Sequence, residues 1–444
     1  MSVVALGTSS GSPTVFRNSS GFALRLGGRV YLFDCGEGTQ RQFLNCNVKP
    51  SHIDSIFISH MHGDHVFGLP AMVLHRVMAK AQQKENSTSS NPNRKTKNES
   101  LQDRIRIYGP PGLFNYLAMS LQLAKVSMKN KGLDIEVFEL LGGRQPVEPY
   151  QNAEIERFDS LGIRYTPIEA IDGVWTIDSG ENPKVGRGKG SMIEVATAED
   201  LDELSMVNVN KKYKDPHDPK SENYDEYESA ESRERRSEYW KSYKLLNDQQ
   251  GAHRPISIKA AEVNHVNGVQ TFGFAVTEKS PPPPIDPDKC RELGVAPGKK
   301  MTALKLGENV FSDDGETVVT PEQVLKPGKR GRKIVYIGDN RFVSKEMKKL
   351  TEKADLVIHE ATNTDDMART SYRRGHSTPL GAVKLATECN TKMLLLTHFS
   401  NRQTSEVEIY KSVYNQTFWH SRLKKIVCAR DFMVIDIPLG GFVI

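Results

Sequence analysis

Residues 59–65, with the sequence SHMHGDH, constrain this chain more than any other stretch. Three histidines and an aspartate fall between an apolar run typical of a strand, Ile53 to Ile58, and a run typical of a helix, Val66 to Lys80. Imidazole and carboxylate groups suit zinc and similar divalent ions, and a strand-to-helix turn brings several side chains to one point. Solvated turn residues are the alternative, but the whole chain has only 12 histidines, and such crowding by chance is rare. The pattern therefore predicts a metal site that includes His60, His62, Asp64 and His65.

This HxHxDH motif resembles the signature of the metallo-β-lactamase superfamily. With the motifs described below, the chain resembles ribonuclease Z, the family of endonucleases that remove the 3′ trailer from precursor tRNA. The resemblance implies an α/β fold, a four-layer αββα sandwich of two mixed sheets, with a protruding flexible arm that binds tRNA. It also implies two zinc ions per chain, with manganese as an alternative metal, and a homodimer.

Three further motifs supply the remaining ligands of the metal site that the resemblance implies. One histidine precedes the strand-like TFGF, an aspartate is the penultimate residue of KIVYIGDN, and another histidine follows LLLT. By resemblance, one zinc ion is held by His60, His62 and His265, the other by Asp64, His65 and His398, and both by the bridging Asp339. Asn340 stands where the family has threonine, which alters the hydrogen-bonded support of the bridging aspartate. Asp34, at the end of YLFD, is expected to orient the site by hydrogen bonding, or to cap the turn that follows.

The same resemblance suggests residues for proton transfer. Asp64 is expected to act as general base. His376, in GHSTP, is expected to protonate the leaving oxygen, steadied by Glu360 in LVIHEAT. The alternative is that His376 and Glu360 form a structural pair that joins a strand to a helix.

Two segments suggest substrate binding. The small-residue loop 7–13, followed by Arg17 and Asn18, resembles the family loop for the tRNA acceptor end, although Val15 stands where the family has lysine. Asp431, in CARDF, is a second candidate for contact with that end, and a plain turn is its alternative. A proline-rich segment resembles the family's flexible arm, and its basic side chains predict phosphate contacts by Lys299, Lys300 and Lys305.

Composition limits the remaining possibilities. The 60 Lys and Arg residues nearly balance the 55 Asp and Glu residues, so RNA binding requires a local patch rather than a strong overall field. Five cysteines without a CxxC pair indicate neither a disulfide framework nor a zinc knuckle. No apolar run approaches the length of a membrane span, and these features together predict the cytoplasm or the nucleus.

The motifs extend over most of the chain, which predicts one domain, residues 1–444, that carries insertions. We expect a polar disordered insertion at 81–100, a long charged insertion at 142–252 and the arm at 280–308. The long insertion is expected to be an appendage, or alternatively an arm that docks RNA or a partner.

Two other functions remain open at the level of the sequence. One is a metallo-hydrolase of the same fold that acts on a small phosphodiester, a thioester or a lactam, for which an arm that grips tRNA has no use. The other is a scaffold without catalysis, against which the seven candidate ligands speak. Metal content per chain separates the scaffold from both enzymes.

Overall fold

The computed structural model describes residues 1–88, 104–129, 133–143, 147–178, 256–281, 283–402, 406–414 and 423–439. The chain forms two compact units. The first unit comprises residues 1–179, 253–280 and 330–444, and the second comprises 180–252 and 281–329.

The first unit contains two mixed β-sheets, in agreement with the predicted fold. Sheet 1 has the strand order β20-β1-β3-β4-β5-β6-β7-β8 and becomes parallel from β4 onward. Sheet 2 has the order β15-β10-β11-β14-β16-β17-β19, with β9 paired to β10, and is parallel from β14 onward. The strands of sheet 1 are β1 (Ser2–Gly7), β3 (Gly21–Leu26), β4 (Arg29–Phe33), β5 (Ile53–Phe57), β6 (Arg104–Gly109), β7 (Asp134–Leu141), β8 (Ile163–Glu169) and β20 (Val434–Asp436). Those of sheet 2 are β9 (Val174–Asp178), β10 (Ile256–Asn264), β11 (Thr271–Glu278), β14 (Lys333–Ile337), β15 (Phe342–Val343), β16 (Leu356–Glu360), β17 (Met393–Thr397) and β19 (Lys425–Cys428). A small parallel pair joins β2 (Ser9–Ser10) to β18 (Phe399–Ser400).

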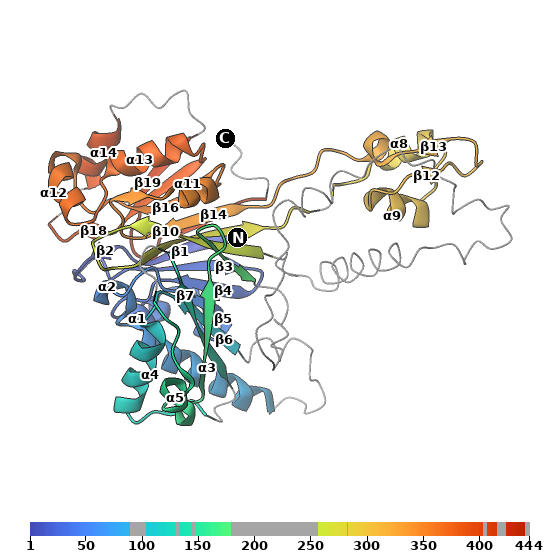
Figure 1. The fold of residues 1–444 in the computed structure, drawn as a ribbon. Helices are drawn as coiled ribbons and strands as arrows, with labels where there is room; N and C mark the ends of the chain where they lie inside the picture. Colours follow the sequence, from blue (N-terminus) through green and yellow to red (C-terminus); the bar gives the residue numbers. More distant parts are fainter. Residues whose placement is uncertain are drawn as a thin grey trace. The chain divides into compact units, whose positions relative to one another are not determined.

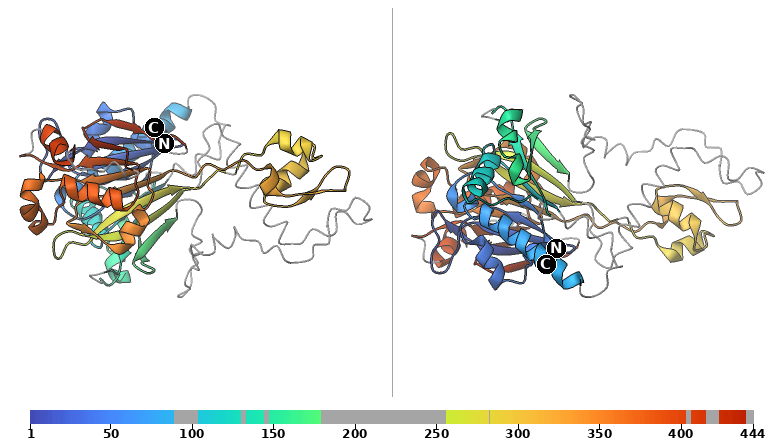
Figure 2. Two further views of the ribbon diagram at one scale, coloured as in Figure 1. Left: turned by 90° about the horizontal axis from the view of Figure 1, so that it is seen from above. Right: turned by 90° about the horizontal axis from the view of Figure 1, so that it is seen from below.

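Helices cover the outer face of each sheet, which gives the four layers seen in Figure 1. Figure 2 shows the orange and red helices over sheet 2 from above, and the blue α3 and teal α4 over sheet 1 from below. The described helices of this unit are α1 (Thr39–Gln42), α2 (Gly63–Val66), α3 (Leu69–Thr88), α4 (Leu113–Leu123), α5 (Asn152–Glu156), α11 (Lys345–Thr351), α12 (Ala368–Arg373), α13 (Pro379–Glu388) and α14 (Glu406–Tyr414). Short 3₁₀ helices span Phe43–Asn45, Pro50–His52, Asp159–Leu161 and Asp365–Met367.

Three hydrophobic clusters hold these layers together. Phe33, Phe57 and Phe274 belong to the cluster between the two sheets, where the ring centroids of Phe33 and Phe57 lie 5.1 Å apart. The second cluster packs sheet 1 against α3 and α4, and the third packs sheet 2 against α11 and α13. Both faces of each sheet are covered, so side chains that point to either face are buried, and the strands are therefore apolar along most of their length.

The second unit has a small core of its own. Its elements are α8 (Pro287–Glu292), α9 (Lys299–Lys305), β12 (Val310–Phe311), β13 (Val318–Val319) and α10 (Pro321–Val324). Cys290, Val295, Leu304 and Val319 are among the buried side chains of this core. The predicted arm at 280–308 therefore corresponds to part of a compact unit that continues to Lys329.

Two predicted boundaries are wrong. Helix α3 does not end at Lys80 but continues to Thr88, because residues 81–85 are good helix formers and residues 81–88 contain neither glycine nor proline. The long insertion does not begin at Gly142, because β8 pairs with β7 and β9 pairs with β10. The rest of these two predicted insertions, residues 89–100 and 179–252, lies outside the described residues.

None of the described helices is long and apolar enough to cross a membrane.

Candidate metal centre

The predicted ligands come together although they are far apart in the chain. Three of the ligands lie at the ends of strands in sheet 2 that run in the same direction. His265 directly follows β10, His398 directly follows β17, and Asp339 is two residues after the end of β14. The HxHxDH residues arrive from sheet 1, after β5. The ligand atoms form two groups, each within 4.8 Å: one of His60, His62, His265 and Asp339, and one of Asp64, His65 and His398. A third group overlaps them and consists of Asp339, His376 and His398.

Hydrogen bonds fix how four of the histidine rings face the centre. The Nδ1–H group of His65 donates to Asp34 Oδ2 at 2.6 Å. That of His265 donates to the Gly375 carbonyl at 2.7 Å. In His60 and His398 the Nδ1 atoms lie 3.0 and 2.9 Å from the hydroxyls of Ser59 and Thr362. Both hydroxyls donate elsewhere, to Asp34 and Glu360, so they accept from the imidazoles. All four Nε2 atoms are thereby left as acceptors, the form in which imidazole binds a metal.

Asp339 presents one carboxylate oxygen to each group. Its Oδ2 atom lies 3.6 Å from His60 Nε2 and 3.8 Å from His265 Nε2. Its Oδ1 atom lies 3.4 Å from His65 Nε2 and 3.1 Å from His398 Nε2. The carboxylate therefore stands between the two groups, as a bridging ligand must.

The electrostatic environment favours metal-binding protonation states in the first group. Burial lowers the pKa of His60, and neighbouring imidazoles lower it further, which keeps the ring neutral. Burial likewise lowers the pKa of His62 and of His265. Burial opposes ionisation of Asp339, but the surrounding histidines outweigh it and hold the pKa of that carboxyl well below its usual range.

The donor set fits a divalent metal. Within the described residues, the buried atoms His60 Nε2 and Asp339 Oδ1 have no hydrogen-bond partner. Unpaired buried polar atoms are costly, and a cation bound to each of these atoms, one in each ligand group, would remove that cost. Nitrogen and carboxylate oxygen ligands in this number suit zinc.

His376 and Glu360, predicted as a proton-donating pair or as a structural pair, lie beside the cluster. His376 Nδ1 is 3.2 Å from Glu360 Oε1 and 3.7 Å from Asp339 Oδ2. Burial alone would lower the pKa of His376, but the carboxylates of Glu360 and Asp339 outweigh it and raise the pKa to about 9. Glu360 is fully buried and also accepts hydrogen bonds from the backbone of Asn340 and Thr362.

Asn340 supports this pair through a buried contact. Its Nδ2 group donates to the Gly338 carbonyl at 2.9 Å and lies 3.3 Å from His359 Nε2. His359 in turn donates through Nδ1 to the Glu360 carbonyl at 2.7 Å. The residue that replaces the family threonine is thus linked to the backbone of Glu360.

The loop with Arg17 and Asn18 is tied into the protein. The Arg17 guanidinium donates to the Ala429 carbonyl at 2.6 Å and lies over the Phe399 ring, 4.7 Å from its centroid. The backbone N–H of Asn18 donates to Asp431 Oδ2 at 2.7 Å, so Asp431 anchors the loop from within. Earlier in the same loop, the N–H of Gly11 donates to Asp64 Oδ2 at 2.6 Å. This contact links the predicted acceptor-end loop directly to a candidate ligand.

The three predicted lysines all lie in the second unit, on or at the ends of α9. Lys300 pairs with Asp313 at 3.0 Å and donates to the Ser312 carbonyl at 3.0 Å. Lys299 is exposed and Lys305 is half-buried.

Sequence reasoning did not single out Ser59, Thr362 or Tyr336, although all three contact the residues around the ligands. Ser59 and Thr362 lie inside the quoted motifs SHMHGDH and LVIHEAT, which is a usable signal. Tyr336 donates to Asp34 Oδ2 at 2.6 Å from the opposite sheet, a contact that no local pattern announces. The predicted capping role of Asp34 is wrong, because Gly38 stands at the N-cap of α1 and no side chain caps it.

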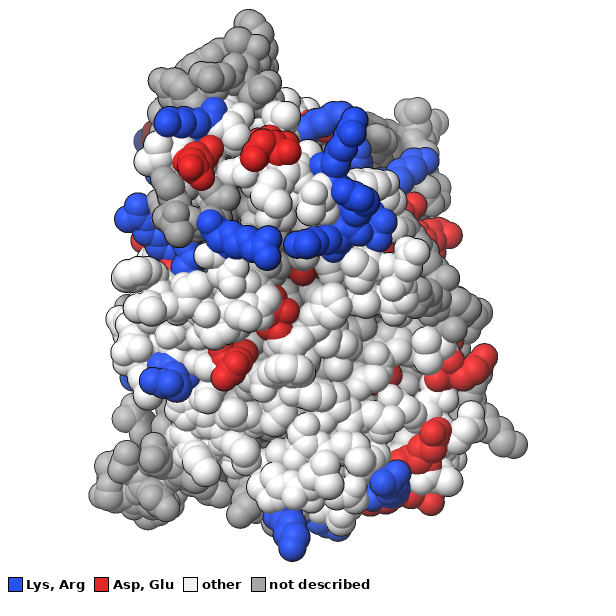
Figure 3. Space-filling model, turned by 90° about the vertical axis from the view of Figure 1, so that its left-hand side faces the viewer, with Lys and Arg blue, Asp and Glu red and all other residues white. Residues whose placement is uncertain are grey.

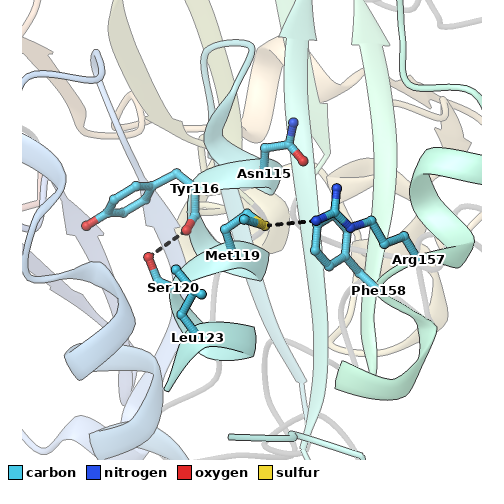
Figure 4. A pocket seen from close by; sticks show the side chains of 7 residues that line it. All are labelled: Asn115, Tyr116, Met119, Ser120, Leu123, Arg157 and Phe158. Carbon is cyan, nitrogen blue, oxygen red and sulfur yellow. Dashed lines mark hydrogen bonds between the residues drawn. The ribbon is translucent and has the colours of Figure 1, made fainter. Parts of the chain in front are cut away.

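A separate hollow of about 430 Å³ lies along α4 (Figure 4). It is lined by Asn115, Tyr116, Met119, Ser120, Leu123, Arg157 and Phe158. It contains neither a histidine nor a carboxylate, so it lacks groups for metal or acid–base chemistry, and we place the functional site at the histidine cluster instead.

Comparison with known proteins identifies the family of this chain. Residues 300–399 match the family model "Beta-lactamase superfamily domain", and residues 1–139 match that of the anti-Pycsar protein Apyc1. The chain is 31% identical to human zinc phosphodiesterase ELAC protein 1, over 99% of both chains, and 26% identical to Bacillus subtilis ribonuclease Z, over 99% of this chain and 100% of that one. The crystal structure of the short form of human tRNase Z aligns with a TM-score of 0.53 at 23% identity, over 99% of this chain and 100% of that one, which supports the shared fold. The chain belongs to the ribonuclease Z family of the metallo-β-lactamase superfamily.

Proposed function

We propose that this protein is a zinc-dependent endoribonuclease that removes the 3′ trailer from precursor tRNA and leaves a 3′-hydroxyl on the tRNA. The observation that carries the proposal is the Asp339 carboxylate between two ligand groups, in a chain of this family. Two zinc ions would be held by His60, His62 and His265 on one side, by Asp64, His65 and His398 on the other, and by Asp339 between them.

The chain's own residues divide the proton transfers. When bound, zinc ions at such a site lower the pKa of water and stabilise charge on the scissile phosphate. Asp64 accepts the proton of the attacking water, with its carboxylate held by the Gly11 N–H. His376, held by Glu360, donates a proton to the leaving 3′-oxygen of the tRNA, so the tRNA ends in a 3′-hydroxyl and the trailer keeps the phosphate. Because Glu360 is fixed by the backbone of Asn340, the donor is oriented before substrate arrives.

Two elements position the RNA in this proposal. The loop that includes Arg17 and Asn18 receives the acceptor end, and the arm contributes phosphate contacts through Lys299, Lys300 and Lys305. The arm grips the tRNA at a distance from the scissile bond, so that binding energy is used to position the reacting phosphate.

We also propose that the protein is a homodimer. Phe67, which follows α2, leaves 62% of its surface exposed and stacks on Tyr116, with ring centroids 6.4 Å apart. Leu123, at the end of α4, is 76% exposed. Exposed apolar residues grouped on neighbouring helices are typical of a protein–protein interface. Light scattering of the wild type and of Phe67→Ser tests this, since the variant should shift toward the monomer.

The deciding experiment is to map the cleavage position on a precursor tRNA with a 5′ label. A single cut directly 3′ of the mature tRNA body, with a 3′-hydroxyl on the product, is expected. Hydrolysis of a small phosphodiester or a thioester without any cut in precursor tRNA would favour the alternative metallo-hydrolase. Two zinc ions per chain by elemental analysis are expected for either enzyme.

A further inference from the structure

Helix α12 carries basic side chains directly next to the candidate proton donor. Arg369, Arg373 and Arg374 are all exposed, and only Gly375 separates Arg374 from His376. No ion pair within the described part of the chain engages any of these three arginines. Figure 3 shows that Lys and Arg side chains gather in a belt across the upper half of this face of the molecule. Arginines that no carboxylate neutralises are available to a ligand with negative charge.

The position of α12 relative to the site is fixed by short contacts. The backbone N–H of His376 donates to the Ser371 carbonyl at 2.8 Å, and the Gly375 carbonyl accepts from His265 Nδ1 at 2.7 Å. Gly375 has a φ of 82°, and a Cβ atom there would lie 2.6 Å from His265 Nδ1. The backbone at Gly375 therefore cannot retreat from the metal centre without breaking this contact, which keeps Arg373 and Arg374 within three residues of His376 and Arg369 one helical turn further away.

A further cation continues this surface. Arg341 donates to the His265 carbonyl, and its guanidinium lies 5.6 Å from the centroid of the Tyr372 ring. Tyr372 is itself 52% exposed. The inner side of α12 is different, because Ser371 is fully buried and accepts a hydrogen bond from Asn363 at 2.8 Å. The helix thus has one side that anchors it and another that presents charge to solvent.

We propose that Arg369, Arg373 and Arg374 form an RNA-binding ridge that contacts backbone phosphates within a few nucleotides of the scissile bond. The inference rests on the proposed function and adds to it a second binding surface, independent of the arm. Arginine suits this role because its planar guanidinium makes paired hydrogen bonds to phosphate oxygens. Positions 369 and 373 are four residues apart, so they lie on the same side of the helix and can contact neighbouring phosphates.

The test uses the full-length protein and a hairpin RNA that contains an acceptor stem and a 3′ trailer but no tRNA elbow. The variant is Arg373→Gln/Arg374→Gln. The matched control is Lys345→Gln/Lys349→Gln, which removes two exposed charges from α11, on another part of the unit. Binding of the hairpin is measured by filter binding over a range of KCl concentrations, and the hydrolysis of bis(p-nitrophenyl) phosphate is measured in parallel.

The ridge variant should bind the hairpin more weakly, and the slope of log Kd against log salt should become shallower by about one for each arginine removed. The control variant should bind like the wild type. Hydrolysis of the small diester and zinc content should stay unchanged in both variants, because neither touches a ligand. Equal binding and equal salt slopes for the ridge variant and the wild type would overturn the inference. A parallel loss of diester hydrolysis would also overturn it, since the arginines would then support the metal centre rather than RNA.

Two hairpins separate the possible sources of the phosphates. If the binding defect persists with a one-nucleotide trailer, the ridge contacts the stem, and if it requires a long trailer, the ridge contacts the trailer; either result supports the ridge. Because binding is measured directly, failure of the ridge is distinct from failure of the proposed function. The latter would appear as wild-type protein that hydrolyses the small diester but does not cut precursor tRNA.

Discussion

The Nδ1 atom of His65 lies 2.6 Å from the Oδ2 atom of Asp34, and both side chains are fully buried. Asp34 also accepts hydrogen bonds from the backbone and hydroxyl groups of Ser59, at 2.7 and 2.8 Å. Since the Ser59 hydroxyl accepts from His60, one carboxylate orients a histidine of each ligand group. Asp34 has a φ of 54°, which a residue other than glycine adopts only when its surroundings hold it there.

Replacement of Asp34 by Asn should weaken metal binding roughly 10- to 100-fold, because an amide has one acceptor oxygen and cannot replace both carboxylate oxygens, of which Oδ2 accepts from His65 and Oδ1 from the Ser59 backbone N–H. Zinc affinity by competition with a chelator, together with turnover at low and high zinc, checks this. Added zinc should restore much of the activity. Asp54→Asn, which affects the contacts of Asp54 with Arg29 and Ser55 and no candidate ligand, serves as control, and unchanged zinc affinity in Asp34→Asn would refute the orienting role.

Asp339→Ala should lose at least one zinc ion per chain and nearly all turnover, because the bridging carboxylate serves both ligand groups. Elemental analysis of the purified variant is the measurement. A variant that retained two tightly bound ions and wild-type turnover would rule out the bridge.

His376→Ala should slow cleavage by about 10²- to 10⁴-fold, the usual range for a general acid, with zinc content unchanged. Single-turnover rates on precursor tRNA report the chemical step, and RNA binding should remain as in the wild type. Because His376 lies 3.7 Å from Asp339 Oδ2, it could instead serve as a ligand, and loss of zinc along with activity would assign it that role.

Replacement of residues 281–329 by a short Gly/Ser linker should abolish efficient cleavage of precursor tRNA and leave hydrolysis of a small diester intact. The reason is that the second unit has its own core and contains none of the candidate ligands. A milder variant, Lys299→Gln/Lys305→Gln, keeps that core and should make the salt dependence of tRNA binding shallower. Unchanged cleavage of precursor tRNA by the linker variant would show that the arm does not bind tRNA.

Glu139 predicts a pH dependence of stability that is separate from catalysis. Burial raises the pKa of this carboxyl to about 7, although the backbone N–H groups of Gly112 and Phe114 donate to it at 3.0 and 2.8 Å. A folded-state pKa above the unfolded value means that the folded state binds the proton more tightly. The resulting stabilisation is complete below about pH 4.5 and is lost as the pH rises through 7, by roughly 3 kcal/mol.

Chemical denaturation at several pH values, compared between the wild type and Glu139→Gln, measures this contribution. The difference in unfolding free energy between the two proteins should change in favour of the variant as the pH rises from 5 to 8. A difference that stays constant over this range would show that Glu139 has the same pKa in both states.

The metal centre could be predicted because each ligand lies in a short motif next to a strand, as His265 lies before TFGF. The two mixed sheets were predicted from the resemblance of these motifs to those of the metallo-β-lactamase superfamily. The start of the long insertion could not be predicted, since β8 and β9 are defined by pairing with distant strands rather than by a local pattern. The contact of Tyr336 with Asp34 depends on how the two sheets pack, which no single stretch of sequence records.

His60 and Asp64 follow a strand of sheet 1, whereas Asp339 and His398 follow strands of sheet 2, so the centre can assemble only after both sheets have folded and packed together. A chain emerging from the ribosome carries the HxHxDH residues early, but it cannot assemble both ligand groups until β17 has been made and the sheets have docked. The order of the ligands along the chain therefore makes the joining of both groups a late event in synthesis, because His398 follows all the other candidate ligands.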